Sequence, residues 1–300
     1  MSMSQSKVEQ SCTWPAPAKL NLFLHITGQR SDGMHELQTV FQFIDLLDWI
    51  NIKVLNSGAI ERPVGMAGVA VEDDLVVRAA KKLKQKSGTK LGAEIEVIKN
   101  IPAGGGLGGG SSDAATTLVA LNQLWDIGMS TEELAELGLS LGADVPVFIR
   151  GRAAWAEGVG EILYRVEPER RDYLVVSPNT SISTAKVFQS KELTRNTRKV
   201  KIAGSLTSSQ VNSLVTTGVN DCEAVVIAHY PEVKDALSWL SQYGEARMTG
   251  TGSSIFVALK SRDEAQKLCQ KLPKQWRGFA LKGMNVSPLM SVVKDNSGIV

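Results

Sequence analysis

The chain has 300 residues, 43% of them hydrophobic and 21% charged, which are the proportions of a globular protein with one large or two ordinary domains. Its 33 basic and 31 acidic residues give a formal net charge of +2, which does not indicate a nucleic-acid-binding protein. Its three widely spaced cysteines, Cys12, Cys222 and Cys269, fit neither a disulfide framework nor a zinc site. With a polar N-terminus and no apolar run of membrane-spanning length, the sequence predicts a cytoplasmic protein that does not enter a membrane.

The first predicted element is a strand. Residues 1–13 are mostly polar and are predicted to form a disordered leader. The run Lys19–Ile26 alternates with a period of two, which predicts a strand with Lys19 and Asn21 on one face. A lysine in such a position is usually solvated, and its place beside Asn21 is what makes Lys19 a candidate site residue.

A turn at Asp32-Gly33 is predicted next, followed by strands over 37–44 and 48–55. His35 directly follows the turn and is expected to be exposed. An exposed loop histidine is usually only solvated, but loops also carry functional residues, so His35 stays a candidate.

A strand, a glycine-rich loop and a helix are predicted between residues 93 and 125. Six glycines lie between Gly104 and Gly110, interrupted by Leu107, and Ser111, Ser112 or Asp113 is expected to cap the following helix. Glycines allow a ligand to approach the backbone closely, and the first N–H groups of a helix have no intrahelical partners. The pattern therefore predicts a phosphate-binding site.

Other interpretations of this loop were weighed. A Walker A motif is absent, because no lysine follows Gly109. The spacing Gly104-x-Gly106-x-x-Gly109, with Asp126 beyond it, does satisfy the dinucleotide fingerprint, so a dinucleotide-binding oxidoreductase stays an alternative. A plain surface turn is also open, although so many glycines carry an entropic cost that a turn does not require.

Helices and strands alternate through the rest of the chain. Asp144, between a predicted helix and a predicted strand, is by itself typical of a capping or turn residue. Phe188, as a lone phenylalanine, is typical of a core residue.

The glycine-bearing segment 151–160 is predicted to be the hinge between two halves. Asp73 or Asp74 is expected to cap a helix over 73–87, and a capping box at Ser130–Glu133 to start one over 130–142. The further predicted elements are helices over 221–229, 231–243 and 261–272, a loop passing into a short helix over 180–189, strands over 147–149, 173–177, 279–282 and 289–293, and a strand, glycine turn and strand over 246–258. The pattern predicts an α+β fold with two lobes, over residues 14–158 and 159–300, and a cleft between them.

Three motifs, each containing glycine or lysine, occur in the order and at the spacings of a known superfamily. Pro102–Ser112 resembles the central phosphate-binding motif of the galactokinase, homoserine kinase, mevalonate kinase and phosphomevalonate kinase superfamily. Ala16–Leu22 and Met248–Phe256 resemble its N-terminal and C-terminal motifs. The segments 32–37 and 142–148 narrow the resemblance to the 4-diphosphocytidyl-2-C-methyl-D-erythritol kinase family, over roughly residues 14–293.

The resemblance implies a two-lobed small-molecule kinase fold with mixed sheets and an active-site cleft between the lobes, and it implies a reaction. The N-terminal lobe would bind ATP and Mg²⁺, and the C-terminal lobe a small molecule with a cytidine diphosphate group. The 2-hydroxyl of that substrate would be phosphorylated in the methylerythritol phosphate route to isoprenoid precursors. Asp144 would be the catalytic base and Lys19 its partner.

The resemblance also implies binding roles. The phosphates of ATP would lie against Pro102, Ala103, Gly104, Gly105, Gly106, Leu107, Gly108, Gly109, Gly110, Ser111 and Ser112. The substrate would be held by Asn21, Met34, His35, Phe188, Gly250 and Gly252, with Phe188 stacked on the cytosine. The family often has an aromatic residue at the position of Met34. No direct metal ligand is assigned, although the hydroxyl of Ser111 or Ser112 could touch Mg²⁺.

Several alternatives stay open at this point. A sibling kinase acting on mevalonate or homoserine is favoured if Asn21, His35 and Phe188 do not line one pocket. A non-enzymatic ligand-binding or regulatory member of the fold would not need both Lys19 and Asp144. The protein is expected to bind its small-molecule substrate and to bind neither nucleic acid nor a membrane. It is expected to be a monomer or a weak homodimer. The basic stretch 195–201 is interpreted as a solvated loop.

Overall fold

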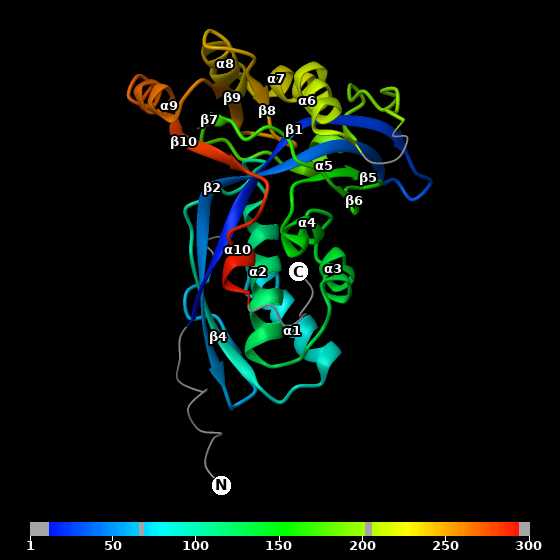
Figure 1. The fold of residues 1–300 in the computed structure, drawn as a ribbon, viewed down its shortest axis with the longest axis vertical. Helices are drawn as coiled ribbons and strands as arrows, with labels where there is room; N and C mark the ends of the chain where they lie inside the picture. Colours follow the sequence, from blue (N-terminus) through cyan, green and yellow to red (C-terminus); the bar gives the residue numbers. More distant parts are fainter. Residues whose placement is uncertain (1–11, 66–68, 202–205, 294–300) are drawn as a thin grey trace.

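The computed structural model describes residues 12–65, 69–201 and 206–293. Two long antiparallel strands, β1 (Cys12–Gln29) and β2 (His35–Leu55), run through both lobes of an elongated molecule (Figure 1). The predicted turn joins them, and Gly33 takes φ +86° there. The predicted leader lies outside the described residues except for Cys12 and Thr13, which already belong to β1.

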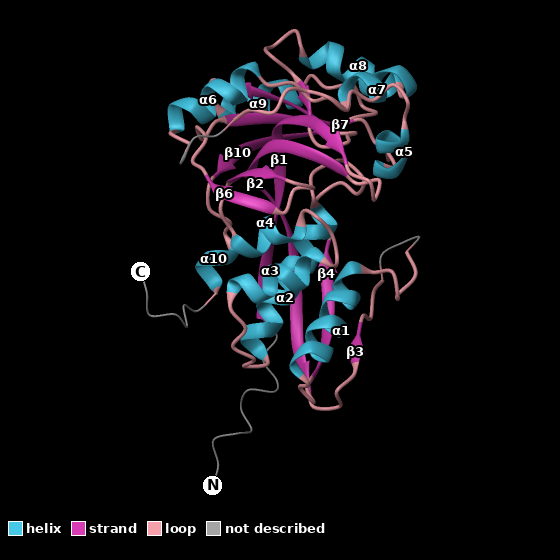
Figure 2. Cartoon of the chain, turned by 90° about the vertical axis from the view of Figure 1, so that its right-hand side faces the viewer, coloured by secondary structure: helices cyan, strands magenta, loops and turns pink. Residues whose placement is uncertain are grey.

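The first lobe is a sheet with helices on one face. Strands β3 (Ile60–Glu61) and β4 (Gly92–Ile98) extend β2 away from β1. The helices on that face are α1 (Leu75–Ser87), α2 (Gly109–Leu124), α3 (Thr131–Leu139), α4 (Val145–Arg150) and α10 (Leu289–Val292) (Figure 2). Small residues at the start of α2, Ala114 and Ala115, are fully buried and allow the helix to pack close to the sheet.

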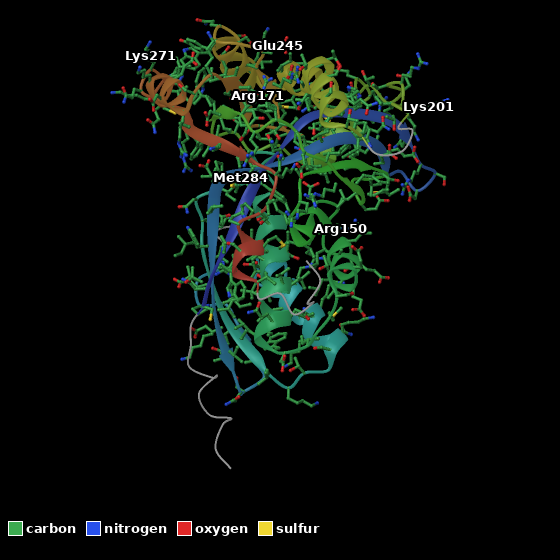
Figure 3. The ribbon with its side chains drawn as sticks, in the orientation of Figure 1. Arg150, Arg171, Lys201, Glu245, Lys271 and Met284 are labelled. Carbon is green, nitrogen blue, oxygen red and sulfur yellow. The ribbon has the colours of Figure 1, made fainter. Side chains whose placement is uncertain are left out.

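The second lobe continues the same sheet. Its strands are β5 (Ala154–Glu157), β6 (Ile162–Arg165), β7 (Asp172–Ser177), β8 (Arg247–Met248), β9 (Ile255–Leu259) and β10 (Arg277–Met284). Its helices are α5 (Thr184–Gln189), α6 (Ser208–Thr217), α7 (Glu223–His229), α8 (Pro231–Leu240) and α9 (Arg262–Cys269). The strand order is β3-β4-β2-β10-β7-β9-β8, with β1, β5 and β6 beside this path. β10 meets β2 at Met284, which lies where the two lobes join (Figure 3).

The predicted α+β class and mixed sheet are confirmed, but two predicted strands are wrong. Residues 147–149 lie in α4, and residues 289–292 form α10. Each helix has a proline at its start, Pro146 or Pro288, and α4 ends at Gly151 in the left-handed region. A short apolar run has no period by which a strand can be told from a buried helix, so the β-branched residues misled the prediction.

The predicted caps of two helices are confirmed. Asp74 accepts a hydrogen bond from the N–H of Val76 at the start of α1, and Ser130 and Glu133 form a capping box at α3. The predicted cap of α2 is wrong, because the helix begins at Gly109 and its cap is Gly108. Gly108, in the left-handed region, starts the helix three or more residues before the predicted caps Ser111, Ser112 and Asp113.

The predicted hinge over 151–160 contains an ordered strand. β5 pairs with both β2 and β6, and Trp155 within it is fully buried. The boundary at residue 158 stays a proposal. β1 and β2 contribute to both lobes, β5 lies in the second lobe just before residue 158, and α10 returns to the first lobe. None of the helices in the described ranges is long and apolar enough to cross a membrane.

Candidate active site

One cavity brings most of the predicted site residues together. It has a volume of about 1030 Å³ and lies between the glycine loop, β1, the start of α4, α5 and the turn before β9. Its lining includes Lys19, Asn21, Met34, His35, Pro102, Ala103, Gly104, Gly105, Gly106, Leu107, Gly108, Gly109, Gly110, Ser111, Asp144, Phe188, Gly250 and Gly252. Ser112 is fully buried and does not line it. A second cavity of about 1200 Å³, beside β6 and residues 199–201, contains none of the predicted site residues.

The glycine loop is held between β1 and the turn before β9. The N–H of Lys19 donates to the carbonyl of Leu107 at 3.0 Å, and the N–H of Ser254 donates to the carbonyl of Gly105 at 3.1 Å. Gly106 requires the absence of a side chain, because a Cβ there would lie 2.2 Å from the carbonyl oxygen of Thr249. The loop therefore fits its neighbours backbone to backbone.

Helix α2 presents an uncapped N-terminus to this cavity. Its N-cap, Gly108, has φ +73° and no side chain that could accept from the first-turn N–H groups. Gly109, Gly110 and Ser111 in that turn all line the cavity. N–H groups without a capping side chain and the positive end of the helix dipole suit this turn to an anion.

A charge cluster with two buried carboxylates fixes the chain on both sides of the loop. Lys99, just before the loop, pairs with Asp48 of β2 and, at 2.7 Å, with Asp113 of α2. The carboxylate of Asp48 also accepts from the N–H groups of Asn100 and Ile101, at 2.5 and 2.9 Å. Burial raises the pKa of Asp113 to about 7, against the pull of Lys99 and with a further rise from the charge of Asp48. Sequence reasoning missed Lys99 and Asp48, which no motif marks.

Lys19 and Asp144 form an ion pair within the cavity. The Nζ of Lys19 lies 3.2 Å from the Oδ2 of Asp144, donates to the Oδ1 of Asn21 and lies 5.2 Å from the ring centre of Phe41. Lys19 is only 3% exposed, so it is not a solvated lysine. Asp144 occupies the N-cap position of α4 but makes no capping hydrogen bond. Its carboxylate therefore pairs with Lys19 and does not cap the helix.

Asn21 is held by three neighbours and in turn orients Lys19. Its Nδ2 donates to the Oγ1 of Thr39 at 3.1 Å, and its backbone N–H donates to the Oγ1 of Thr249 at 2.8 Å. A Cβ at Gly250 would lie 3.3 Å from the Oδ1 of Asn21, so the glycine turn lies directly against this group. Thr39 and Thr249 were not predicted, since single threonines in strands and turns carry no signal.

His35 is buried, which corrects the prediction that it is exposed. Its ring stacks on Phe188, with 5.0 Å between ring centres and 25° between planes, and its Nε2 accepts from the Nε of Arg195 at 3.0 Å. Desolvation lowers the pKa of His35, and the charge of Arg195 lowers it further. Met34 is 49% exposed at the cavity edge. The packing of α5 against the start of β2 buries His35, which sequence spacing does not reveal.

Asn21, His35 and Phe188 thus line one cavity with Lys19, Asp144 and the glycine loop. The structure therefore joins a helix N-terminus suited to anions, a lysine–carboxylate ion pair and an aromatic recess. Arg195, from the basic stretch that was interpreted as solvated, also lines this cavity. Among the described residues, no group of three or more His, Cys, Asp or Glu side chains could hold a metal ion.

Family models match both parts of the chain. Residues 74–152 match the GHMP kinases N terminal domain, and residues 193–278 match the GHMP kinases C terminal model. These matches include the glycine loop and Asp144. They support an ATP-dependent kinase and give no support to the dinucleotide-binding alternative.

Similar proteins extend over nearly the whole chain. A 4-diphosphocytidyl-2-C-methyl-D-erythritol kinase of Nitrosococcus oceani is 53% identical over 94% of this chain and 98% of its own length. One of Mannheimia succiniciproducens is 49% identical over 97% and 94%. A crystal structure of 4-(cytidine 5'-diphospho)-2C-methyl-D-erythritol kinase is 30% identical, covers 91% of this chain and 99% of its own, and superposes with a TM-score of 0.77. A mevalonate kinase structure, 16% identical over 92% of this chain and all of its own, shares the fold with a TM-score of 0.64. The chain belongs to the 4-diphosphocytidyl-2-C-methyl-D-erythritol kinase family.

Proposed function

We propose that this chain transfers the γ-phosphoryl group of ATP to the 2-hydroxyl of 4-diphosphocytidyl-2-C-methyl-D-erythritol, in the methylerythritol phosphate route to isoprenoid precursors. The observation that carries the proposal is the Lys19–Asp144 pair, which lies in one cavity with the glycine loop and with His35 and Phe188. A donor site, a reacting pair and a base-binding recess are the three parts that this reaction needs.

The glycine loop and the first turn of α2 hold the phosphates of ATP. Their backbone N–H groups are suited to phosphate oxygens, and the helix dipole favours negative charge there. Mg²⁺ is a hard cation that takes oxygen ligands and keeps several waters, so a hydroxyl and phosphate oxygens suffice for it. Ser111 lines the cavity, and the buried Oγ of Ser112 has no hydrogen-bond partner among the described residues. Bound with the nucleotide, Mg²⁺ would offset charge on the phosphates.

Asp144 accepts the proton of the attacking hydroxyl. Phosphoryl transfer through a loose transition state depends mainly on positioning and charge neutralisation, and a general base assists as the new bond forms. Lys19 holds the carboxylate of Asp144 at 3.2 Å and offsets negative charge beside it. Asn21 keeps the ammonium of Lys19 in place through its Oδ1.

The cytidine end of the substrate binds beside His35 and Phe188. Met34 lies on the cavity edge, at a position where the family often has an aromatic residue. Its side chain is flexible and polarisable, which suits it to pack against the cytosine ring of the bound substrate. Gly250 and Gly252 take positive φ in a turn that lies against Asn21 at Gly250, and both line the cavity where the substrate binds.

We further propose that the protein works in the cytoplasm as a monomer or weak homodimer. All three cysteines, Cys12, Cys222 and Cys269, are free, as suits a reducing compartment.

The substrate is tested by measuring ADP release from ATP and Mg²⁺ with a panel of alcohols. We expect rapid turnover with 4-diphosphocytidyl-2-C-methyl-D-erythritol, and very little with mevalonate or homoserine. The matched control is 2-C-methyl-D-erythritol 4-phosphate, which keeps the acceptor hydroxyl and lacks the cytidine. Equal turnover of the control would show that the cytidine group is not recognised, and preferred turnover of mevalonate or homoserine would overturn the proposal.

A further inference from the structure

One arginine of the basic stretch 195–201 is turned into the site. The guanidinium of Arg195 donates through NH2 to the carbonyls of Phe188 and Ser190, at 2.9 and 2.6 Å, and through NH1 to the carbonyl of Leu193 at 3.1 Å. The N–H on its Nε donates to the Nε2 of His35 at 3.0 Å. Arg198, three residues later, is exposed, which is the usual state of an arginine in such a run.

The contact between Arg195 and His35 fixes the protonation pattern of the imidazole. An arginine side chain can only donate hydrogen bonds, so the Nε2 of His35 must present its lone pair to it. In the neutral ring the proton is then on Nδ1. Desolvation, and next the nearby charge of Arg195, lowers the pKa of His35 and favours this neutral ring.

The Nδ1–H group is the hydrogen-bonding group that His35 has left for a ligand. His35 lines the cavity, and no described residue forms a hydrogen bond with its Nδ1. A pyrimidine base can form a hydrogen bond with this donor only through an acceptor atom. At position 3 cytosine has an acceptor nitrogen, whereas uracil has an N–H that would face the Nδ1–H donor to donor. O2 is an acceptor in both bases, so this donor distinguishes them only where it meets position 3.

We propose that Arg195 is a positioning residue that sets base specificity: it holds His35 as the Nδ1–H tautomer, and this donor selects the acceptor edge of cytosine over uracil. The proposal rests on the proposed function, because that function places the cytidine end of the substrate beside His35. Arg195 also ties the carbonyl of Phe188 to the same guanidinium, so the stacking ring and the imidazole are positioned together.

The tautomer can be measured without any substrate. We expect the ¹⁵N NMR spectrum of the wild-type protein at pH 7.5 to show Nδ1 of His35 protonated and Nε2 unprotonated. Arg195→Met keeps an unbranched stem and removes the donor, so a mixture of tautomers should appear, while Arg198→Met should leave the spectrum unchanged. A wild-type His35 protonated on Nε2 would overturn the proposal, and this result needs no variant to fold.

The selectivity is measured as kcat/KM for the cytidine substrate against its uridine analogue. A mispaired buried donor is costly, so Arg195→Met should reduce the preference for cytidine by about 10–100-fold. The loss should appear mainly in KM, with little change in kcat. Arg198→Met should keep the wild-type preference. An Arg195→Met protein with a wild-type melting temperature and an unchanged preference would overturn the proposal.

Failure of this inference and failure of the proposed function give different results. If wild type does not turn over the cytidine substrate, the substrate assignment fails, whatever the tautomer of His35. If wild type turns it over but does not discriminate against the uridine analogue, the substrate assignment stands and the role of Arg195 fails.

Discussion

Among single residues, Lys19 depends most on its surroundings. It is nearly fully buried, and its ammonium group is held by Asp144, by the Oδ1 of Asn21 and by the ring of Phe41. A buried charge is tolerated only when it is paired and hydrogen-bonded, so these contacts fix the ammonium in one place. That place is beside the carboxylate proposed as the base.

We predict that Lys19→Met lowers kcat by about 10²–10⁴-fold, because both the orientation of Asp144 and the local positive charge are lost. The measurement is steady-state ADP release at saturating ATP. Lys53→Met, at an exposed position of β2, is the matched control and should keep wild-type kcat. A Lys19→Met enzyme with wild-type kcat would remove Lys19 from the proposed mechanism.

The sequence predicted which residues gather at the site, but it did not predict their surroundings. Period-two alternation placed Lys19 and Asn21 on one face of a strand, but it could not show that the glycine loop covers that face. Asp144 by itself looked like a capping residue, and only the structure shows that it makes no capping bond. Arg195 was missed because a charge run is usually solvated, and nothing local distinguishes the one side chain that turns inward.

Among the elements, the glycine loop and α2 act as one unit. Gly108 is both the N-cap of α2 and a contact of the reacting pair, since a Cβ there would lie 2.8 Å from the Cζ of Phe148 and 3.0 Å from the Cε of Lys19. Its φ of +73° is also unfavourable for any side chain. The proposed phosphate site and Lys19 thus pack closely together at Gly108.

Gly108→Ala should therefore destabilise the fold by about 1–3 kcal/mol and lower kcat, because Lys19 and Phe148 must move. Urea unfolding and ADP release measure the two effects. Gly110→Ala provides the contrast in stability, since its Cβ would meet only the Cδ1 of Leu75, at an ordinary 3.5 Å. If Gly108→Ala is as stable as Gly110→Ala, the tight packing of the loop is not real.

The cluster of Asp48, Lys99 and Asp113 predicts a pH dependence of stability. The pKa of Asp113 is raised in the folded state to about 7, so the folded protein binds more protons than the unfolded chain between about pH 4 and pH 7. This contribution to stability is present at low pH and is lost as the pH rises through about 7. Asp113→Asn should flatten that part of the profile, and urea unfolding at pH 5, 6, 7 and 8 measures it. An identical pH profile in the two proteins would contradict the raised pKa.

At the scale of elements, the sequence predicted the helices whose ends are marked by capping side chains. It did not predict the type of element correctly for short apolar runs. The caps at Asp74 and Ser130 were readable because side chains make them. The start of α2 was not, because its cap is a glycine. Helices α4 and α10 are too short, at six and four residues, to show a helical period.

For the whole molecule, β1 and β2 make the two lobes one structure. Where the lobes join, Gln42 is fully buried and donates to the carbonyl of Glu169 and to the Oδ1 of Asn285, at 3.1 and 2.9 Å. Its Oε1 accepts from the hydroxyl of Tyr173 at 2.8 Å. This buried network ties β2 of the first lobe to β7 and to the end of β10. The two-lobed fold was predictable from the order of the elements, but the continuity of the sheet between the lobes was not.

Gln42→Leu should destabilise the whole protein by about 1–3 kcal/mol, because the hydroxyl of Tyr173 and the amide of Asn285 lose a buried partner. We expect one unfolding transition, at the same urea concentration by tryptophan fluorescence and by circular dichroism. In a double-mutant cycle, adding Tyr173→Phe to Gln42→Leu should cost less than Tyr173→Phe alone. Two separate transitions in the wild-type protein would show that the lobes do not unfold as one.

The measurement that tests the central claim most directly is ADP release from ATP and Mg²⁺ with 4-diphosphocytidyl-2-C-methyl-D-erythritol, in wild type and in Asp144→Asn. We predict strong wild-type turnover and a loss of about 10²–10⁴-fold in kcat in the variant, the usual worth of a general base. KM for both substrates should change little, and Asp235→Asn, at an exposed position on α8, should behave as wild type. Equal turnover in wild type and Asp144→Asn would contradict the assignment of Asp144 as the base, and no turnover in either would contradict the substrate.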